Sequence, residues 1–218
     1  PLRDGKWSDG KPVRAQDFEY AWKRALNPKT KSKYAYILYP IKNAKKYNNG
    51  EVGESDVGVR ALDDKTLEVQ LEEPIPYFLS LTTFSAYLPQ RKDIVEKFGG
   101  DYAKEADKMV YNGPFVLAEW EHEQYLVLKK NDQYWDRNAV FLEEVKIDII
   151  KETSKGLNQY ISNEKDITML DKAYAEAFRS SPEFISVSRS LTQFIQFNTR
   201  NAFLSNTKIR KAISLAID

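Results

Sequence analysis

The chain of 218 residues contains no cysteine and a single histidine, His122. The absence of cysteine excludes disulfides, thiolate metal sites and a cysteine nucleophile. His122 lies among Glu119, Glu121 and Glu123 at an expected strand bend, without a glycine-rich nucleophile elbow, so we interpret it as a solvated surface residue. The sequence also lacks a phosphate loop and a zinc-ligand spacing. We therefore expect a protein that is not an enzyme, with no catalytic residue, metal site or cofactor.

A charge excess and a long hydrophobic run are absent as well. The 33 basic and 32 acidic side chains nearly cancel, so no strong net field draws the chain toward nucleic acid or an anionic membrane. No segment approaches the roughly 20 apolar residues of a membrane helix, and the first residues lack the basic and apolar regions of a signal peptide. The sequence thus predicts a soluble chain that does not bind nucleic acid.

Turn signals and apolar spacing predict the elements of the first part of the chain. The Ser-Asp-Gly turn at 8–10 offers a glycine for positive φ and an aspartate that bonds nearby backbone. Apolar residues at helical spacing over 18–25 predict a helix, which Asn27-Pro28 ends. The alternating segments 57–62 and 66–71 predict a β-hairpin.

The rest of the chain mixes helices with short alternating segments, which predicts an α+β (mixed α/β) protein with a boundary near residue 89. The expected elements are a short helix near 34–39, a short helix or strand at 77–81, a strand pair at 115–120 and 124–129, strands at 145–149, 166–169, 184–187 and 193–197, and helices at 157–161, 174–178 and 209–217. Ser205 or Asn206 is the expected N-cap of the last helix.

Aromatic side chains are abundant, with four Trp and 13 Tyr. Such side chains combine a large contact area with a polar tip and can line a binding site. Trp22, Trp120 and Trp135 each lie in an apolar pattern, so we expect them in the core. Tyr34 and Tyr36 have polar neighbours, and their placement in the core is less well supported.

Several motifs in a fixed order resemble a known family. They are Trp7 to Val13 with Asp17-Phe18 and Trp22, then Leu62 to Val69, Pro74 to Phe78, Asn112 to Phe115, Asn131 to Asp136, and Asn198-Thr199 followed by Ile209 to Ala212. Each motif is weak alone, and the ordered set is specific. The chain resembles the extracellular solute-binding proteins of family 5, in the peptide-binding branch that serves ABC importers.

The sequence departs from the family pattern at three places. Arg14 stands where a Thr or Ser usually caps the following helix. At 163–167 a stretch that begins with Asn163 replaces a Gly-Glu-Ile-Asp type of sequence, and asparagine can adopt the left-handed conformation of the glycine. Ala202 replaces a usual proline. These departures affect local turns rather than the resemblance.

The resemblance implies a periplasmic-binding-protein type II-like bilobed fold, of which this chain holds an accessory domain and part of one lobe. Residues 1–88 resemble the accessory domain, 89–190 the central part of the transporter-facing lobe, and 191–218 the crossover into the opposite lobe. The apolar pattern at the end of the chain has no Gly or Asn cap, and we expect the chain to be a fragment of a longer protein.

The same resemblance implies that an oligopeptide lies extended between the two lobes. Tyr34 matches a peptide-contacting tyrosine, which makes it the first candidate ligand-binding residue. Met169 and Leu170 align with ligand-facing positions but differ in residue type. Gln196 lies on the expected strand that crosses toward the site, where its role is either structural or ligand-binding.

The implied partners are an oligopeptide ligand and the permease subunits of an ABC importer in the membrane, with the binding protein itself a monomer. The implied location is extracytoplasmic, as a cell-surface lipoprotein or a periplasmic protein. Two alternatives stay open. A sugar- or metal-chelate-binding member of the same superfamily would use the same scaffold, and a hydrolase could assemble its carboxylates from distant residues.

Overall fold

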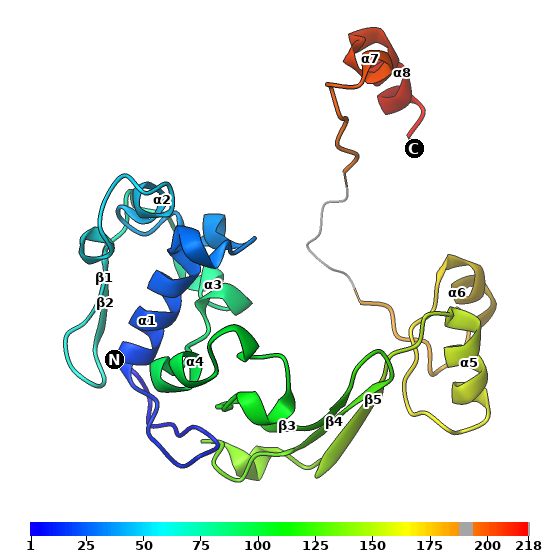
Figure 1. Ribbon diagram of the computed structural model, residues 1–218. Helices are drawn as coiled ribbons and strands as arrows, with labels where there is room; N and C mark the ends of the chain where they lie inside the picture. The colour runs from blue at the N-terminus through cyan, green and yellow to red at the C-terminus, as the bar shows by residue number, and fades with distance from the viewer. Residues whose placement is uncertain (188–193, 218) are drawn as a thin grey trace. The chain divides into compact units, whose positions relative to one another are not determined.

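The computed structural model describes residues 1–187 and 194–217, which divide into two compact units. The first unit spans Pro1–Glu152, and the second begins at Thr153. Helices and strands mix along the chain, which confirms the expected α+β class (Figure 1). The domain boundary expected near residue 89 is not the boundary between these units, and the domain ranges stay a prediction.

The elements of the first unit have short connections. Its α-helices are α1 (Ala15–Leu26), α2 (Ala44–Asn48), α3 (Phe78–Leu81) and α4 (Lys92–Phe98). Its strands are β1 (Val59–Ala61), β2 (Leu67–Val69), β3 (Phe115–Glu121), β4 (Tyr125–Lys130) and β5 (Glu144–Asp148). Its 3₁₀ helices are η1 (Pro28–Thr30), η2 (Ala35–Leu38), η3 (Glu54–Asp56), η4 (Ser85–Tyr87), η5 (Gly99–Asp101), η6 (Ala106–Lys108) and η7 (Arg137–Ala139).

Helix α1 forms because its apolar residues recur at helical spacing and Asn27-Pro28 ends it, as predicted. Trp22 and Leu26 are buried against residues of η2, α2 and β1 in one hydrophobic core. The Trp22 indole also donates a hydrogen bond to the Tyr87 carbonyl at 2.8 Å. Arg14 is the N-cap residue, and its guanidinium has no acceptor for the backbone N–H groups of the first turn. Of the two hydrogen bonds in a capping box, only the one to the Asp17 side chain forms, in which the Arg14 backbone N–H donates to Asp17 Oδ2 at 2.9 Å.

The predicted β-hairpin is confirmed as the antiparallel pair β1–β2, in which Val59 faces Val69. Its turn is closed by Asp63, whose carboxylate accepts the N–H groups of Lys65 and Thr66. The Glu19 side chain of α1 holds the hairpin, because it accepts the Ala61 N–H at 2.8 Å. Three backbone hydrogen bonds fix the open end of the hairpin. The Lys42 N–H donates to the Gln70 carbonyl, the Gln70 N–H to the Gly58 carbonyl, and the Gly58 N–H to the Lys42 carbonyl.

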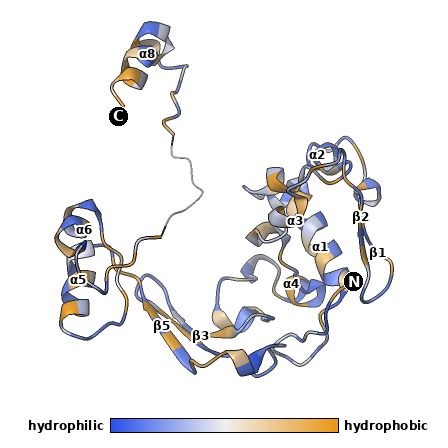
Figure 2. Ribbon diagram, turned by 180° about the vertical axis from the view of Figure 1, so that it is seen from behind, coloured by the Kyte–Doolittle hydropathy of each residue, from blue (hydrophilic) through white to orange (hydrophobic). Residues whose placement is uncertain are grey.

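The predicted second strand pair and the strand after it form one antiparallel sheet in the order β3–β4–β5. Phe115 faces Lys130, the register shifts between Leu117 and Glu119, and Leu128 faces Val145. Apolar residues of these strands can be followed in orange in Figure 2. Val127 of the central strand is buried, whereas Ile147 is 43% exposed.

The turn at residues 6–13 binds the first unit together through its side chains. Trp7 is buried, and its indole N–H donates to Asp17 Oδ2 at 3.0 Å. Ser8 exchanges two hydrogen bonds with Tyr111, one from Ser8 N to the Tyr111 carbonyl at 2.6 Å and one from Tyr111 N to Ser8 Oγ at 3.1 Å. Gly10 takes φ +84°, which confirms the predicted turn.

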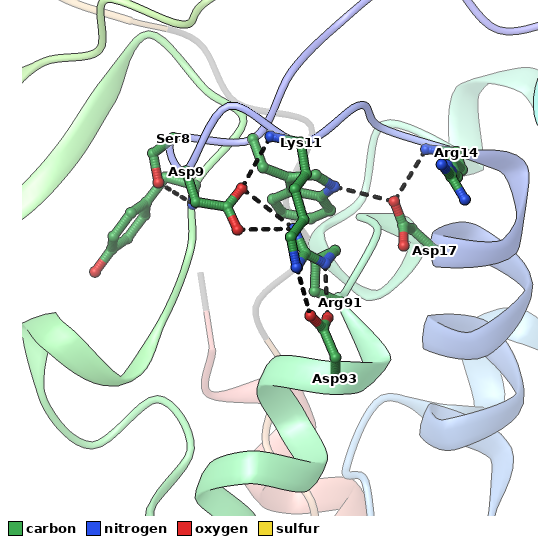
Figure 3. A network of polar contacts seen from close by, with 9 residues as sticks. Ser8, Asp9, Lys11, Arg14, Asp17, Arg91 and Asp93 are labelled. Carbon is green, nitrogen blue, oxygen red and sulfur yellow. Dashed lines mark hydrogen bonds and ion pairs between the residues drawn. The ribbon is translucent and has the colours of Figure 1, made fainter.

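An ionic cluster continues this turn into α4. Figure 3 shows Arg91 between the carboxylates of Asp9 and Asp93. The Arg91 side chain is 7% exposed and lies 3.1 Å from Asp9 Oδ2, while its Nε donates to Asp93 at 2.7 Å. Lys11 Nζ reaches Asp93 at 3.2 Å. The hydrogen bond from Arg91 holds the pKa of Asp93 well below its ordinary value.

The second unit contains α5 (Thr153–Ile161), α6 (Lys172–Phe178), α7 (Ala202–Ser205) and α8 (Thr207–Leu215). Asn163 follows α5 with φ +59°, the left-handed conformation predicted for it. Asn206 is the N-cap of α8 and accepts the Lys208 N–H at 2.9 Å, which confirms one of the two predicted caps. Ala202 is simply the first residue of α7, the position where proline is favoured.

The strands expected in the second unit are wrong. Residues 166–169 and 184–187 form no strand, and neither do 194–197, while residue 193 lies outside the described residues. Alternation describes how a segment would fit a sheet face, but a strand also needs a partner for its ladder. Ile167 and Ile185 accordingly stay 83% and 82% exposed.

The expected core position of Trp135 is also wrong. Its side chain is 52% exposed, and the Arg3 guanidinium lies 4.1 Å from its ring centroid. Trp22 is buried as predicted. Trp120 is half-buried and stacks on His122, with the ring centroids 4.4 Å apart. Apolar neighbours in sequence predicted a core position for all three, but of these only Trp22 is buried in the hydrophobic core.

Gly58→Ala should destabilise the first unit, because the added Cβ would lie 2.7 Å from Lys42 Cβ and 2.8 Å from the Gln70 carbonyl oxygen. We expect a loss of about 1–3 kcal/mol in the free energy of unfolding, as for other overpacked sites. Gly100→Ala is the matched control, since its Cβ would meet nothing within 4 Å. Equal urea midpoints for the two variants would contradict this account of Gly58.

Arg91→Met should lower stability at neutral pH by about 1.5–3 kcal/mol, the range for hydrogen bonds to charged groups. Because the folded pKa of Asp93 is depressed, its contribution is present above the ordinary value of 3.8 and is lost as the pH falls below it. The difference between wild type and variant should therefore shrink in acid. Urea unfolding on both sides of that pH measures it, with Lys92→Met as an exposed control; a difference that does not change with pH would refute the assignment.

Candidate functional site

Tyr34 lies directly before η2 and is the first candidate of the sequence analysis. Its side chain is 51% exposed, and its ring centroid lies 5.4 Å from that of Phe84 at an interplanar angle of 59°. The Tyr34 N–H donates to Ser32 Oγ at 3.3 Å. Two aromatic rings thus meet at the surface of the first unit, where a ligand can contact both.

Phe84 is a residue that the sequence reasoning missed. It stands directly before η4, and the Tyr87 N–H donates to its carbonyl at 2.9 Å. The Tyr87 hydroxyl donates to the Ile37 carbonyl of η2 at 3.0 Å. Because η2 and η4 are joined in this way, the Tyr34 and Phe84 rings are held by the core rather than by a loose loop. The only sequence signal was an aromatic residue in a polar stretch.

Further apolar side chains are exposed on η2, on α3 and just after η4. Tyr36 of η2 is 59% exposed, Leu79 of α3 is 80% exposed, and Leu88, which follows η4, is 56% exposed. Exposed apolar residues in such number are typical of surfaces that meet a ligand or another part of a protein. Among these exposed residues, Tyr34 is the one whose ring packs against Phe84.

Met169 and Leu170 lie in the second unit, beside a pocket of about 500 Å³. Met169 is 73% exposed, whereas Leu170 is half-buried. The lining is mostly apolar and comes from α5, α6 and the segments 166–170 and 184–187. Its apolar members are Leu157, Ile167, Met169, Leu170, Ala175, Phe178, Phe184, Ile185 and Val187.

The lining of this pocket also includes polar groups. Tyr160 donates from its hydroxyl to Glu183 Oε2 at 2.7 Å, and this hydrogen bond raises the pKa of the Tyr160 phenol. Asp166 lines the pocket as a further carboxylate. An apolar hollow with a few polar groups is suited to the side chain of a ligand rather than to a charged metabolite.

Gln196 is exposed and belongs to a segment without helix or strand. Met169, Leu170 and Gln196 are residues of the second unit, and Tyr34 is a residue of the first. The structure therefore brings together Met169 and Leu170 around one pocket. In the first unit, it places the Phe84 ring against the ring of Tyr34.

A second hollow, of about 620 Å³, lies along α1 and the β1–β2 hairpin. Charged residues dominate its lining, among them Glu19, Lys23 and Arg60. Lys23 Nζ lies 2.6 Å from Glu19 Oε1, and the other carboxylate oxygen of Glu19 accepts the Ala61 N–H. Glu19 and Lys23 already have partners that hold the hairpin, so we assign this hollow to the scaffold.

The single histidine and the potential metal ligands stand apart in the part of the chain that the structure describes. His122 is exposed, as predicted, and its Nε2 lies 3.4 Å from the Glu105 carboxylate. In residues 1–187 and 194–217, no three metal-binding side chains of His, Cys, Asp or Glu come together. Within the same residues, none of the helices has the length and apolarity to cross a membrane.

Known proteins are similar to this chain over almost its whole length. The oligopeptide-binding protein OppA of Bacillus subtilis is 39% identical over 223 residues, which cover 100% of this chain and 41% of that protein. The dipeptide-binding protein DppE of the same organism is 37% identical and covers 99% of this chain and 39% of its own length. The solved structure of Listeria monocytogenes OppA bound to peptide matches with a TM-score of 0.90 at 37% identity, over 98% of this chain and 43% of that one.

The chain thus spans about two fifths of the length of these curated relatives. The structural match covers α- and β-elements of both units, so the fold is that of part of an oligopeptide-binding protein. The family described as bacterial extracellular solute-binding proteins, family 5 (middle), matches residues 1–218. This chain belongs to the extracellular solute-binding proteins of family 5.

Proposed function

We propose that the protein is the substrate-binding component of an ABC importer, which captures oligopeptides between two lobes and delivers them to the membrane permease. The observation that carries the proposal is the family match over all 218 residues, together with a structural neighbour described as bound to peptide. Both relatives compared above are named as peptide-binding proteins, one for oligopeptides and one for dipeptides.

The proposed ligand-binding residues are Tyr34, Met169, Leu170 and Gln196. Tyr34 offers an exposed ring already oriented by Phe84, so little side-chain entropy is lost when a ligand contacts it. Leu170 lines an apolar pocket suited to a ligand side chain, and Met169 has a flexible side chain that adapts to different shapes. An extended peptide bound mainly by main-chain hydrogen bonds would explain affinity with broad side-chain tolerance.

The proposed domain ranges follow the same template. Residues 1–88 form the accessory domain, 89–190 the central part of the transporter-facing lobe, and 191–218 the crossover into the opposite lobe. The buried Tyr87 and the Arg91 cluster stand at the first of these boundaries. Such contacts would hold the accessory domain firmly to the lobe.

Binding without chemical conversion is the activity that we propose. Family 5 proteins are solute-binding proteins, and the one histidine of this chain is an exposed residue paired with Glu105. The protein acts outside the cytoplasm, as a cell-surface lipoprotein or a periplasmic protein. Its partners are the oligopeptide and the permease subunits, and it acts as a monomer. A sugar or a metal chelate as the ligand is the alternative that the first experiment tests.

Calorimetry of the intact protein with a mixture of short peptides should give saturable binding, and a peptidase assay on the same sample should give no turnover. A sugar mixture and a metal chelate serve as parallel ligands. Saturable binding of either in place of peptide would replace the proposed ligand class. Peptide cleavage at enzyme-like rates would overturn the proposal of binding without conversion.

Tyr34→Ala in the intact protein should weaken peptide binding by about 1–3 kcal/mol, which is roughly fivefold to 150-fold in Kd. The melting temperature should change little, because the side chain is half exposed. Tyr36→Ala is the comparison variant, since Tyr36 is 59% exposed on the 3₁₀ helix that Tyr34 precedes; it should weaken binding less, because the ring that packs on Phe84 is that of Tyr34. A large fall in melting temperature with unchanged affinity would make Tyr34 a structural residue instead.

A further inference from the structure

The chain contains two Asn-Gly pairs, Asn49-Gly50 and Asn112-Gly113. In such a pair the glycine nitrogen can attack the side-chain amide carbon of asparagine, because glycine has no side chain to shield its nitrogen. The reaction requires that this N–H and the asparagine amide are both free of other bonds. The structure places the two pairs in opposite situations.

Asn49-Gly50 is held in an unreactive arrangement at the end of α2. The Gly50 N–H donates to the Tyr47 carbonyl at 2.9 Å, so the attacking nitrogen is occupied. The Asn49 side-chain amide donates to Glu51 Oε1 at 2.9 Å. The Asn49 backbone is helical, with φ −83° and ψ −6°, and its N–H donates to the Lys45 carbonyl. Both reacting groups would have to leave their partners.

Asn112-Gly113 has none of these restraints. Both residues are half-buried and lie outside helix and strand, just before β3. Among the described residues, neither the Asn112 side chain nor the Gly113 N–H has a hydrogen-bond partner. A Cβ added at Gly113 would meet no heavy atom within 4 Å. Within the described residues, the two reacting groups thus lack the hydrogen bonds that hold Asn49 and Gly50 apart.

We propose that Asn112 is a site of spontaneous covalent modification, at which its side chain closes on Gly113 and is converted to aspartate or isoaspartate. The Gly113 nitrogen loses its proton to solvent base and forms a bond to Asn112 Cγ. The Cγ–Nδ2 bond breaks, and the nitrogen leaves as ammonia. Water then opens the five-membered succinimide at either carbonyl. No oxidant or reductant takes part.

The position of Asn112 gives the modification a structural effect. Tyr111 on one side is fixed to Ser8 by two hydrogen bonds. On the other side, the Gly113 carbonyl accepts the Asn131 side-chain amide at 2.8 Å. An isoaspartate adds one backbone carbon between these two fixed points, so one of them must move. The modification would loosen the attachment of the turn at residues 6–13 to the β3–β4–β5 sheet.

The test is an ageing experiment on the intact folded protein at mildly alkaline pH, followed by tryptic digestion and peptide mass spectrometry. The peptide of residues 109–129 reports Asn112, and that of residues 47–60 reports Asn49. We expect the amide-to-carboxylate mass increase to accumulate severalfold faster at Asn112 than at Asn49. The rate should rise with pH, because the Gly113 nitrogen must lose its proton before it attacks.

Two controls separate the folded structure from the local sequence. In urea-unfolded protein both pairs should react at similar rates, since the bonds that protect Asn49 are gone. Gly113→Ala, for which the structure has space, should fold normally and slow the reaction at Asn112. Equal rates at the two sites in the folded protein, or an Asn112 that stays unmodified while Asn49 reacts, would overturn the proposal.

Discussion

Tyr87 is the residue on which the arrangement of the first unit depends. It is 1% exposed, its ring meets Trp22 edge-on with centroids 4.9 Å apart, and its carbonyl accepts the Trp22 indole. Its hydroxyl donates to Ile37, which joins η4 to η2. Burial raises the pKa of this phenol to about 12, so the hydroxyl keeps its proton and stays a donor at physiological pH. The exposed pair Tyr34–Phe84 owes its fixed geometry to this buried neighbour.

The motifs by which the family is recognised serve the scaffold wherever the described contacts reveal their role. Trp7 is buried against Asp17, Asp9 pairs with Arg91, and Asn131 closes its own turn by accepting the Gln133 N–H. These contacts lie within the protein itself. The family motifs are therefore, in these cases, residues that stabilise the first unit. This explains why sequence motifs predict the class of protein better than they predict its ligand.

Local signals predicted those elements whose stability is also local. The hairpin at 57–71, the helix ended by Asn27-Pro28, the positive φ of Asn163 and the cap Asn206 all depend on neighbours in sequence. The errors arose where an element needs a distant partner. Residues 166–169 and 184–187 alternate like strands but have no ladder. Trp135 lies in an apolar motif, but its ring contacts only the neighbouring Tyr134 and Arg3 among the described ring contacts, and it is 52% exposed.

The site could be predicted only in outline. Tyr34 was reached through the family motif, but its partner Phe84 stands 50 residues further along the chain in a polar stretch, and only the fold brings them together. In the same way, the apolar lining around Leu170 comes from α5, α6 and two extended segments. Contacts between residues far apart in sequence are the information that a single sequence does not carry.

The bonds of the turn at residues 6–13 also bear on the order in which the chain folds. Ser8 bonds to Tyr111, a separation of 103 residues, and Asp9 bonds to Arg91 across 82. Closing a loop of this length costs conformational entropy before the contact that stabilises it can form. Such contacts therefore form late and lower the folding rate. During synthesis, α1 and the hairpin can assemble before Arg91 and Tyr111, the partners of this turn, have been made. The turn at residues 6–13 is thus among the last parts of the first unit to reach its final place.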